Sequence, residues 1–435
     1  MREAVGVPAT FTGWLDSATF TRVSGWANAP VSIHVNGELI ATVTPSIQRP
    51  DLPEGSLGFN APIDPLRLVR GENEVRVSFA DTGALIGKGV KTVALSVSPE
   101  LISGFSLAGV TRGLWTLFNL NKTDDRIAID GWFVAPPGAA SPRVFSDGED
   151  LSFSCRPDAQ LQGQMWLPME APVHRYEAAF KFRGSTLRLS FGALGRSFNL
   201  DHDCVIPRDL SLQPEKAQIR RVSGGFDGLK FDMQGLTTAE RLRSVFARYG
   251  ELPLSEASVM DWGVGAGRVA RFLAPDAGKF CGVDVDADNL AWCRDNLHGV
   301  YQHIDTDPPT PLPSAQFDFI YGISIVTHLT PEYEKRWLAE LRRLAKDDGI
   351  VALSIHGPIA LMVMGNCERQ AELAAQGFVD LGENKILAGR VPDGYYRNVA
   401  QSFAHLHEVW SEFFTILDIL PGAIGLQDLV VLRPL

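Results

Sequence analysis

Three alternating glycines constrain this chain more than any other feature of its sequence. They stand in the run Val-Met-Asp-Trp-Gly-Val-Gly-Ala-Gly-Arg at positions 259–268, where an apolar strand ends at Asp261 and a helix is expected to follow. Gly263, Gly265 and Gly267 let a small ligand approach the backbone, and a helix N-terminus adds unpaired N–H groups. The spacing differs from the Gly-x-Gly-x-x-Gly of dinucleotide sites, and Asp261 would repel a pyrophosphate. The loop therefore predicts a ligand that carries a cationic amine.

A second acidic residue stands at the end of the next apolar strand. Asp284 closes the run Cys-Gly-Val-Asp. A carboxylate at this edge of a sheet can accept hydrogen bonds from both hydroxyls of a ribose. Taken alone, Asp284 would more simply cap a turn or a helix. The glycine loop upstream favours the nucleoside-binding function.

Strand and helix patterns alternate from residue 237 onward, which predicts a mostly parallel sheet with helices on both faces. The expected strands are 258–261, 280–284, 300–304, 317–321 and 349–355, and the expected helices are 269–273, 287–296 and 331–345. Two further apolar strands, at 413–420 and 428–433, are joined by a loop too short for a crossover helix. The last strand is therefore expected to be antiparallel.

The first two hundred residues alternate apolar and polar side chains between turn signals, the pattern of half-buried strands. Trp26 and the following Asn36-Gly37 turn recur loosely as Trp132 and Asp147-Gly148. This predicts two related β-sandwiches, at 1–97 and 98–205, although Gly-Trp pairs are common enough for coincidence. Prolines and glycines then break any period, so residues 206–235 are expected to be a linker before a domain at 236–435.

The C-terminal motifs together resemble the class I S-adenosylmethionine-dependent methyltransferases. The resemblance rests on residues 261–268, 282–284, 317–329 and 341–349, and covers about 236–435. It implies a Rossmann-like α/β fold with an antiparallel last strand, and S-adenosyl-L-methionine as cofactor. The implied cofactor-binding residues are Asp261, Gly263, Gly265, Gly267, Arg268, Asp284 and Gly322. We expect Asp305, which follows the third strand, to bind the adenine, with Asp307 as its rival.

Two narrower resemblances suggest a setting. Residues 354–357, 394–397 and 427–433 are similar to methyltransferases encoded with bacterial surface-polysaccharide enzymes. In the N-terminal part, residues 13–18, 23–26, 49–52 and 58–59 look like β modules fused to glycosyltransferases. These resemblances imply a glycan or glycolipid-linked acceptor, with glycosyltransferases as possible partners of the β modules.

Methyl transfer to a hydroxyl needs a base, and two histidines are expected at the carboxyl edge of the sheet. His328 follows strand four and His356 follows strand five. A well-placed histidine contributes roughly 10²–10⁴-fold to such a proton transfer. Either histidine is a candidate base, and either can instead be a loop residue that orders the site.

The segment 357–412 is too long for a simple crossover and is expected to form an acceptor-side insertion. Its Tyr395, Tyr396 and Arg397 suit the apolar face and the hydroxyl groups of a sugar. We predict no metal site. Asp201 and Asp203 flank a histidine, but an exposed turn explains them better.

Composition limits the remaining choices. A net charge of −11 disfavours nucleic acid, and no apolar run approaches the length of a membrane span. Five scattered cysteines without Cys-x-x-Cys spacing predict neither a disulfide framework nor a thiolate zinc site. The chain is therefore expected to be cytoplasmic.

Two other functions compete with glycan methylation: a small-molecule O- or N-methyltransferase, and a binding scaffold whose methyltransferase-like domain is inactive. The β modules carry no catalytic cluster, so we expect them to hold a polymer or a partner. A fragment of residues 230–435 should then fold and bind cofactor by itself, unless the modules cover an apolar face of the catalytic domain.

Overall fold

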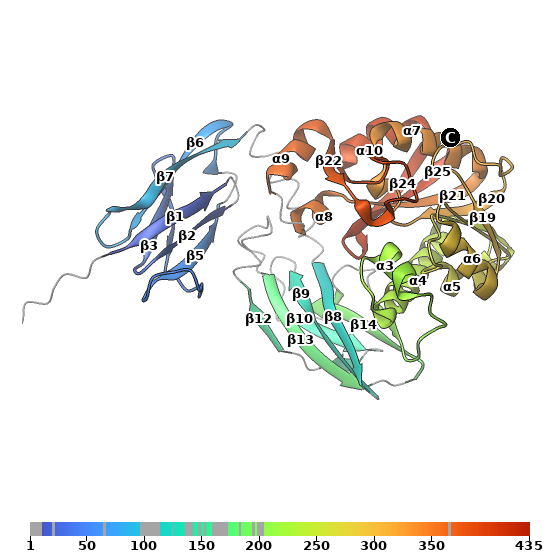
Figure 1. The fold of residues 1–435 in the computed structure, drawn as a ribbon, viewed down its shortest axis with the longest axis horizontal. Helices are drawn as coiled ribbons and strands as arrows, with labels where there is room; N and C mark the ends of the chain where they lie inside the picture. Colours follow the sequence, from blue (N-terminus) through green and yellow to red (C-terminus); the bar gives the residue numbers. More distant parts are fainter. Residues whose placement is uncertain are drawn as a thin grey trace, which may run out of the picture. The chain divides into compact units, whose positions relative to one another are not determined.

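The computed structural model describes residues 11–19, 22–63, 67–95, 114–123, 125–134, 142–146, 149–151, 154–158, 173–181, 184–193, 196–197, 204–363 and 367–435. The chain divides into two compact units. The first contains the strands up to residue 95, and the second contains the later strands (Figure 1).

The first β region, residues 13–95, forms seven paired strands. They are β1 Gly13–Ala18, β2 Arg22–Ala27, β3 Val31–Val35, β4 Glu38–Val43, β5 Leu57–Pro62, β6 Gly71–Phe79 and β7 Leu85–Leu95. The spatial order is β4-β3-β6-β7-β1-β2-β5, so β7 links the β4-β3-β6 half to the β1-β2-β5 half. Its pairing with β6 is antiparallel and its pairing with β1 is parallel.

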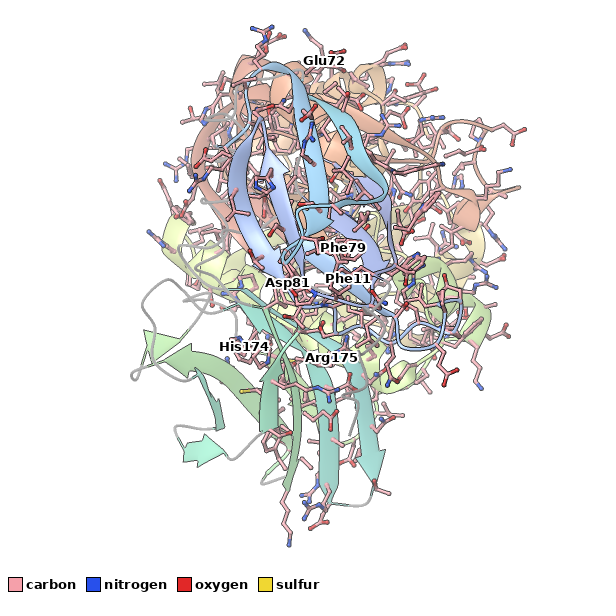
Figure 2. All side chains as sticks on the ribbon, turned by 90° about the vertical axis from the view of Figure 1, so that its left-hand side faces the viewer. Phe11, Glu72, Phe79, Asp81, His174 and Arg175 are labelled. Atoms are coloured by element: carbon pink, nitrogen blue, oxygen red, sulfur yellow. The ribbon has the colours of Figure 1, made fainter. Side chains whose placement is uncertain are left out.

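The predicted alternation determines which side chains of the first β region are buried. Val31, Ile33 and Val35 of β3 are buried, whereas the residues between them are half-exposed. Asn36 and Gly37 join β3 to β4 with φ values of 50° and 84°, the left-handed backbone of a two-residue hairpin turn. Figure 2 shows Glu72 and Phe79 at opposite ends of β6, where Phe79 stacks on Phe11 at 5.2 Å.

The second β region, residues 114–207, contains two sheets. Its strands are β8 Leu114–Thr123, β9 Arg126–Val134, β10 Pro142–Ser146, β11 Glu149–Leu151, β12 Ser154–Pro157, β13 Val173–Lys181, β14 Thr186–Ala193, β15 Arg196–Ser197 and β16 Cys204–Pro207. One sheet has the order β12-β13-β9-β8, and the other joins β11, β10, β14, β15 and β16. Asp147 and Gly148, the predicted second turn, and residues 201–203 lie outside the described residues.

The two β regions share a pattern of strand pairing. In the first, β1 pairs with β2, β3 with β4 and β3 with β6. In the second, β8 pairs with β9, β10 with β11 and β10 with β14. The predicted β-rich N-terminal part is therefore confirmed, and the shared pattern agrees with the predicted repeat. That each region is a sandwich stays a prediction.

The predicted linker is wrong, because most of residues 206–235 are helical. Helix α3 spans Lys216–Ser223 and helix α4 spans Gly228–Tyr249. Asp227 caps α4, since its side chain accepts hydrogen bonds from the N–H groups of Leu229 and Lys230 at 2.9 and 3.1 Å. The glycines that suggested a linker thus lie around a helix start.

Helix α4 belongs to two cores at once. Near its N-terminus, Met233 lies in a hydrophobic cluster with residues of β8, β9, β13, β14 and β16, and Leu229 packs against that cluster. Farther along, Leu242 and Phe246 lie in a cluster with the sheet of the C-terminal domain. The second β region and the C-terminal domain therefore share a helix, which explains why they form one compact unit.

The C-terminal sheet confirms the predicted parallel strands. Its members are β17 Ser258–Trp262, β18 Lys279–Asp284, β19 Val300–His303, β20 Phe317–Gly322, β21 Ala345–Ile355, β24 Phe414–Ile424 and β25 Gln427–Pro434. The order is β19-β18-β17-β20-β21-β25-β24. As expected, β25 is antiparallel to both β21 and β24.

The helices between these strands include the three that the sequence predicts. They are α5 Ala270–Leu273, α6 Ala287–Asn296 and α7 Pro331–Leu344, together with two short 3₁₀ helices, η3 Ala274–Asp276 and η4 Val326–His328. A further 3₁₀ helix, η2 Leu254–Glu256, precedes β17. The segment between β21 and β24 contains α8 Pro358–Val363, α9 Cys367–Gln376, β22 Phe378–Glu383, η5 Lys385–Leu387, β23 Arg397–Gln401, α10 Phe403–Val409 and η6 Trp410–Glu412. Strands β22 and β23 pair as a separate small sheet.

Candidate functional site

The glycine loop after β17 adopts a backbone that other residues rarely adopt. Gly263, Gly265 and Gly267 have φ values of 80°, 54° and 70°. A Cβ atom on Gly263 would lie 2.0 Å from Ile325 Cδ1, and one on Gly265 would lie 2.7 Å from Val222 Cγ2. Both the backbone and the available space therefore require glycine at these two positions.

A cavity of about 370 Å³ lies at the carboxyl ends of the parallel strands. Eight of the predicted site residues line it: Asp261, Gly263, Gly265, Arg268, Asp284, His328, Tyr395 and Tyr396. Five others do not: Gly267, Gly322, Asp305, His356 and Arg397. The structure thus brings together side chains from the loop, from two strand ends and from the insertion.

The residues outside the lining have other surroundings. A Cβ atom on Gly267 would lie 2.2 Å from Leu297 Cδ1, and one on Gly322 would lie 2.7 Å from Trp262 Cε3, so both glycines permit close packing. Asp305 is exposed, and Asp307 forms an ion pair with Arg336. Adenine binding by Asp305 stays a prediction.

Asp261 and Arg268 place a buried carboxyl group and a buried guanidinium against the cavity wall. Asp261 is 3% exposed, accepts a hydrogen bond from Tyr321 Oη at 2.8 Å, and has its pKa raised to about 8 by burial. Burial also lowers the pKa of Arg268. Its Nε has no hydrogen-bond partner among the described residues, and its Nη1 lies 3.4 Å from Gln234 Oε1. This buried acid and cation suit the ammonium and carboxylate of an amino-acid group.

Asp284 is held in place by two backbone donors. Its Oδ2 accepts from the N–H of Gly265 at 2.7 Å and its Oδ1 from the N–H of Asp286 at 2.8 Å. Burial is the main influence on its pKa, which is raised. Asp286 in turn forms ion pairs with Arg221 of α3 and Arg390 of the insertion, at 2.7 and 3.0 Å. Each oxygen of Asp284 retains a lone pair for a ligand hydroxyl.

The two candidate histidines are both bound to strand β23, but they differ at Nε2. His328 Nδ1 lies 2.6 Å from the carbonyl oxygen of Arg397, and His356 Nδ1 lies 3.1 Å from that of Val399. A carbonyl only accepts, so both Nδ1 atoms carry the proton. Gln427 Nε2 lies 3.4 Å from His356 Nε2, whereas among the described residues no hydrogen bond to His328 Nε2 is found. Only His328 of the two lines the cavity.

Burial keeps both imidazoles neutral. It lowers the pKa of His328 to about 3, against the opposing effect of the Arg397 carbonyl. It also lowers the pKa of His356. His328 is therefore a neutral hydrogen-bond acceptor across the physiological pH range.

The three predicted substrate residues point in different directions. The ring of Tyr396 stacks on that of His328, with centroids 4.0 Å apart. Tyr395 accepts a hydrogen bond from Trp337 Nε1 at 3.3 Å. Arg397 Nε donates to Asp380 Oδ2 at 2.5 Å, so its guanidinium is engaged within the β22–β23 hairpin.

A polar network that the sequence did not predict lies around His356. Ser324 has a φ of 62°, unusual for a residue with a side chain, and its N–H donates to Ser354 Oγ at 2.7 Å. The Gln427 amide joins Ser324 Oγ, Ser354 Oγ and His356. Gln427 begins an antiparallel strand, so it lies at the edge where parallel strands end. That topological rule is the signal that could have identified it.

A family model matches this part of the chain. Residues 260–353 match the family described as a methyltransferase domain. The chain carries a methyltransferase domain. S-adenosylmethionine is the cofactor that this family uses, in agreement with the predicted cofactor. The matched residues include the glycine loop, Asp284 and His328, but not the β regions.

Several solved structures are similar to part of the chain at low identity. The PH0226 protein from Pyrococcus horikoshii OT3 is 16% identical, with 46% of this chain and 90% of that chain covered and a TM-score of 0.34. Magnesium protoporphyrin IX methyltransferase from Synechocystis PCC 6803 is 14% identical, with 50% and 93% covered and a TM-score of 0.35. N-methyltransferase NodS from Bradyrhizobium japonicum WM9 is 14% identical, with 51% and 97% covered and a TM-score of 0.33. At such TM-scores these structures add nothing to the strand order described above.

Membrane-spanning helices and metal-binding clusters are two other features that bear on function. None of the helices within these ranges has the length and apolar character to span a bilayer. In the same part of the chain, no group of three or more His, Cys, Asp or Glu side chains is arranged to hold a metal ion.

Proposed function

We propose that the methyltransferase domain methylates an oxygen atom, and that its acceptor is a sugar hydroxyl of a bacterial surface glycan or of a glycan precursor. The observation that carries the proposal is His328, a neutral imidazole in the cavity wall whose Nε2 is free to accept a proton. The glycan part rests on the resemblance to polysaccharide-cluster enzymes and on aromatic side chains in the lining.

The cofactor-binding roles follow from the charges in the cavity. Asp261 is suited to the ammonium group of S-adenosylmethionine, Arg268 to its carboxylate and Asp284 to its ribose hydroxyls. The unpartnered Nε of Arg268 supports this fit, because a buried guanidinium is stabilised by an anion. When bound, the cofactor supplies an electrophilic methyl group on a positively charged sulfur.

His328 is suited to receive the acceptor's proton during attack rather than before it. With a pKa near 3, the imidazole is too weak a base to remove a sugar hydroxyl proton in advance. Its Nδ1–H bond to Arg397 fixes the ring so that Nε2 can accept a hydrogen bond from the hydroxyl. His356, whose Nε2 accepts from Gln427, serves instead to hold β23.

The remaining parts of the proposal concern setting. We place the reaction in the cytoplasm and assign Tyr395 and Tyr396 to the acceptor side of the cavity. We regard both β regions as sandwich modules that bind a glycan or a glycosyltransferase. Arg397 contributes through its backbone carbonyl, because its side chain is paired with Asp380.

A labelling experiment tests the proposal. The full chain is incubated with methyl-labelled S-adenosylmethionine and a cell extract fractionated into glycans, lipid-linked sugars and small molecules. Label should enter a sugar fraction as a base-stable methyl ether. His328→Asn should slow transfer roughly 10²–10⁴-fold, with cofactor affinity measured by calorimetry nearly unchanged, and His356→Asn should slow it less.

Three results would contradict the proposal. Label in a small amine or phenol would favour the small-molecule alternative, and no transfer despite tight cofactor binding would favour the scaffold alternative. Equal loss in both histidine variants would reject His328 as the proton acceptor.

Asp284→Ala should weaken cofactor binding strongly, since it removes two charge-assisted hydrogen bonds worth about 1.5–3 kcal/mol each before solvent compensation.

A further inference from the structure

Motif residues that lie far apart in the sequence meet on one face of the first β region. Trp14 of β1 pairs directly with Trp26 of β2. Gly87 of β7 is the partner of Trp14 on one side, and Gly58 of β5 is the partner of Trp26 on the other. Because directly paired residues share a face of a sheet, these four residues form a row across four strands.

This face is turned away from the core. Val23 and Ala27, which alternate with Ser24 and Trp26 along β2, are at most 1% exposed. Trp14 is 40% exposed, and Trp26 is half-buried. A Cβ atom on Gly87 would lie 2.2 Å from Trp14 Cε3, so glycine at this position lets the indole ring lie close against β7. The result is an aromatic platform that is open at Trp14 and covered at Gly58, which is buried.

Charged side chains border the platform in fixed positions. Arg49 Cδ lies 3.1 Å from where a Cβ atom of Gly58 would be, which places Arg49 beside the row. Its guanidinium donates to both oxygens of Asp51, at 3.1 and 2.7 Å, and to Asp16 Oδ2 at 2.5 Å. Lys88 Nζ lies 5.3 Å from the Trp14 ring centroid. Three ion-paired groups therefore lie at the Gly58 end of the row, and an ammonium lies over the exposed indole at the other end.

We propose that this face, centred on Trp14 and Trp26, binds a glycan chain. The apolar C–H face of a pyranose ring packs on an indole, whose π face is flat and weakly solvated. Sugar hydroxyls at the ring edge both donate and accept, so they match a border that offers carboxylate acceptors and guanidinium donors together. A face of this mixed charge fits a neutral or weakly charged glycan better than nucleic acid, which would meet Asp16 and Asp51.

The site is separate from methyl transfer. Every residue that forms it belongs to the first β region, and cofactor is not needed for binding. The inference rests on the part of the proposed function that assigns glycan binding to the β regions, and it names the face of the first region that would do so. Glycan binding can therefore be measured on cofactor-free protein, and its failure is distinguishable from failure of methylation.

Binding is tested with the full chain and three probes: cellohexaose, chitohexaose, and surface polysaccharide purified from the cells that encode the chain. Tryptophan fluorescence and saturation-transfer NMR report binding. At least one probe should bind, and Trp14→Ala should weaken it about tenfold or more, with Trp14→Tyr retaining part of the affinity. Leu39→Ala is the matched control, because Leu39 is 53% exposed on β4 and lies outside the row.

The outcomes separate cleanly once thermal unfolding shows that each variant is folded. Loss in Trp14→Ala and not in Leu39→Ala supports the glycan face. Binding of none of the three probes overturns the proposal, as does equal affinity in the wild type and Trp14→Ala. Equal loss in Leu39→Ala also overturns it, because binding would then not depend on the row. Cofactor affinity should be the same in all these variants.

Discussion

The two β regions begin alike and end differently. In each region the first strand pairs with the second, and the third strand pairs with both the fourth and a later strand. Each region also carries a Gly-Trp pair on its second strand. The last strand separates them. In the first region β7 has 11 residues and pairs with both β6 and β1. In the second, β16 has four residues and pairs with β14.

The end strand has a different role in each region. Strand β7 joins the two halves of the first region into one continuous strand order. Strand β16 instead contacts α4: the N–H of Val205 donates to Thr237 Oγ1 at 2.9 Å, and Met233 completes the hydrophobic cluster. The same strand pattern thus ends in a strand that joins two halves in one case and in a strand that packs on a helix of the methyltransferase domain in the other.

The paired tryptophans show the same contrast. Trp26 is half-buried on an open face, whereas Trp132 is fully buried, with its Nε1 lacking a hydrogen-bond partner among the described residues. A repeated residue therefore contributes to the surface in one region and to the interior in the other. Sequence similarity between the two regions therefore does not carry over to the exposure of this side chain.

The largest expected effect comes from truncating the chain at two positions, either within α4 at residue 230 or before the second β region at residue 98. The shared helix contradicts the expectation that residues 230–435 fold alone, since that fragment lacks β16, α3 and the cap of α4. We expect it to aggregate or bind cofactor poorly, whereas residues 98–435 should bind with nearly full affinity. Gel filtration and calorimetry with S-adenosylhomocysteine compare them. Full affinity in the shorter fragment would show that α4 does not need the second β region.

Matched core truncations should sharpen the comparison. Ile206 of β16 and Ile33 of β3 are both fully buried, and replacing either with Ala should destabilise its own unit by about 2–5 kcal/mol. Cofactor should raise the unfolding temperature of the unit that contains the methyltransferase domain. Only Ile206→Ala should lower that temperature, because Ile206 shares a cluster with α4. Calorimetric melts with and without cofactor measure this. A similar loss from Ile33→Ala would mean that the two units unfold together.

Acid should weaken the methyltransferase domain through His328. Its folded pKa of about 3 lies below the unfolded value of about 6.5, so between these pH values the unfolded chain holds a proton that the fold excludes. The free energy of unfolding therefore decreases as the pH is lowered, by up to about 1.4 kcal/mol for each pH unit. Asp261 and Asp428, whose pKa values are raised to about 8 and about 7 by burial, act in the opposite direction, because the fold retains their protons.

The His328→Asn variant isolates this contribution. Urea unfolding at pH 7 and pH 5 should show a smaller acid loss in His328→Asn than in the wild type, and Ile33→Ala should leave the slope unchanged. An identical acid loss in His328→Asn and the wild type would mean that His328 is not held neutral by burial.

The smallest expected effect concerns two exposed ion pairs of equal length. Arg188 and Glu240 join β14 to α4 at 3.2 Å, and Arg76 and Glu74 lie 3.2 Å apart on β6. Replacing either arginine with Ala should cost less than about 1 kcal/mol, since exposed pairs are well solvated. Denaturant titration compares them. A loss above about 2 kcal/mol for Arg188→Ala alone would show that the junction with α4 depends on charge as well as on apolar packing.

The sequence by itself was sufficient to predict the strands of the methyltransferase sheet and the glycine loop. Its strands are continuous apolar runs, and its loop needs glycine because Gly263 and Gly265 combine positive φ with close neighbours. Asp261 and Asp284 were predictable for the same reason: parallel strands end at a common edge, so residues at strand ends converge. These signals are local, and a short window of sequence contains them.

Tertiary structure decided what the local signals left open. Gly228 and Gly235 resemble linker residues, yet a Cβ atom on Gly235 would lie 1.9 Å from the carbonyl oxygen of Arg268, so glycine here permits close packing of α4 against the loop. The difference between His328 and His356 depends on Gln427, which is distant in sequence. Likewise, Trp14, Trp26 and Gly87 lie in one row only because β1 lies between β2 and β7. Contacts between distant segments depend on strand order, and periodicity along the chain does not encode that order.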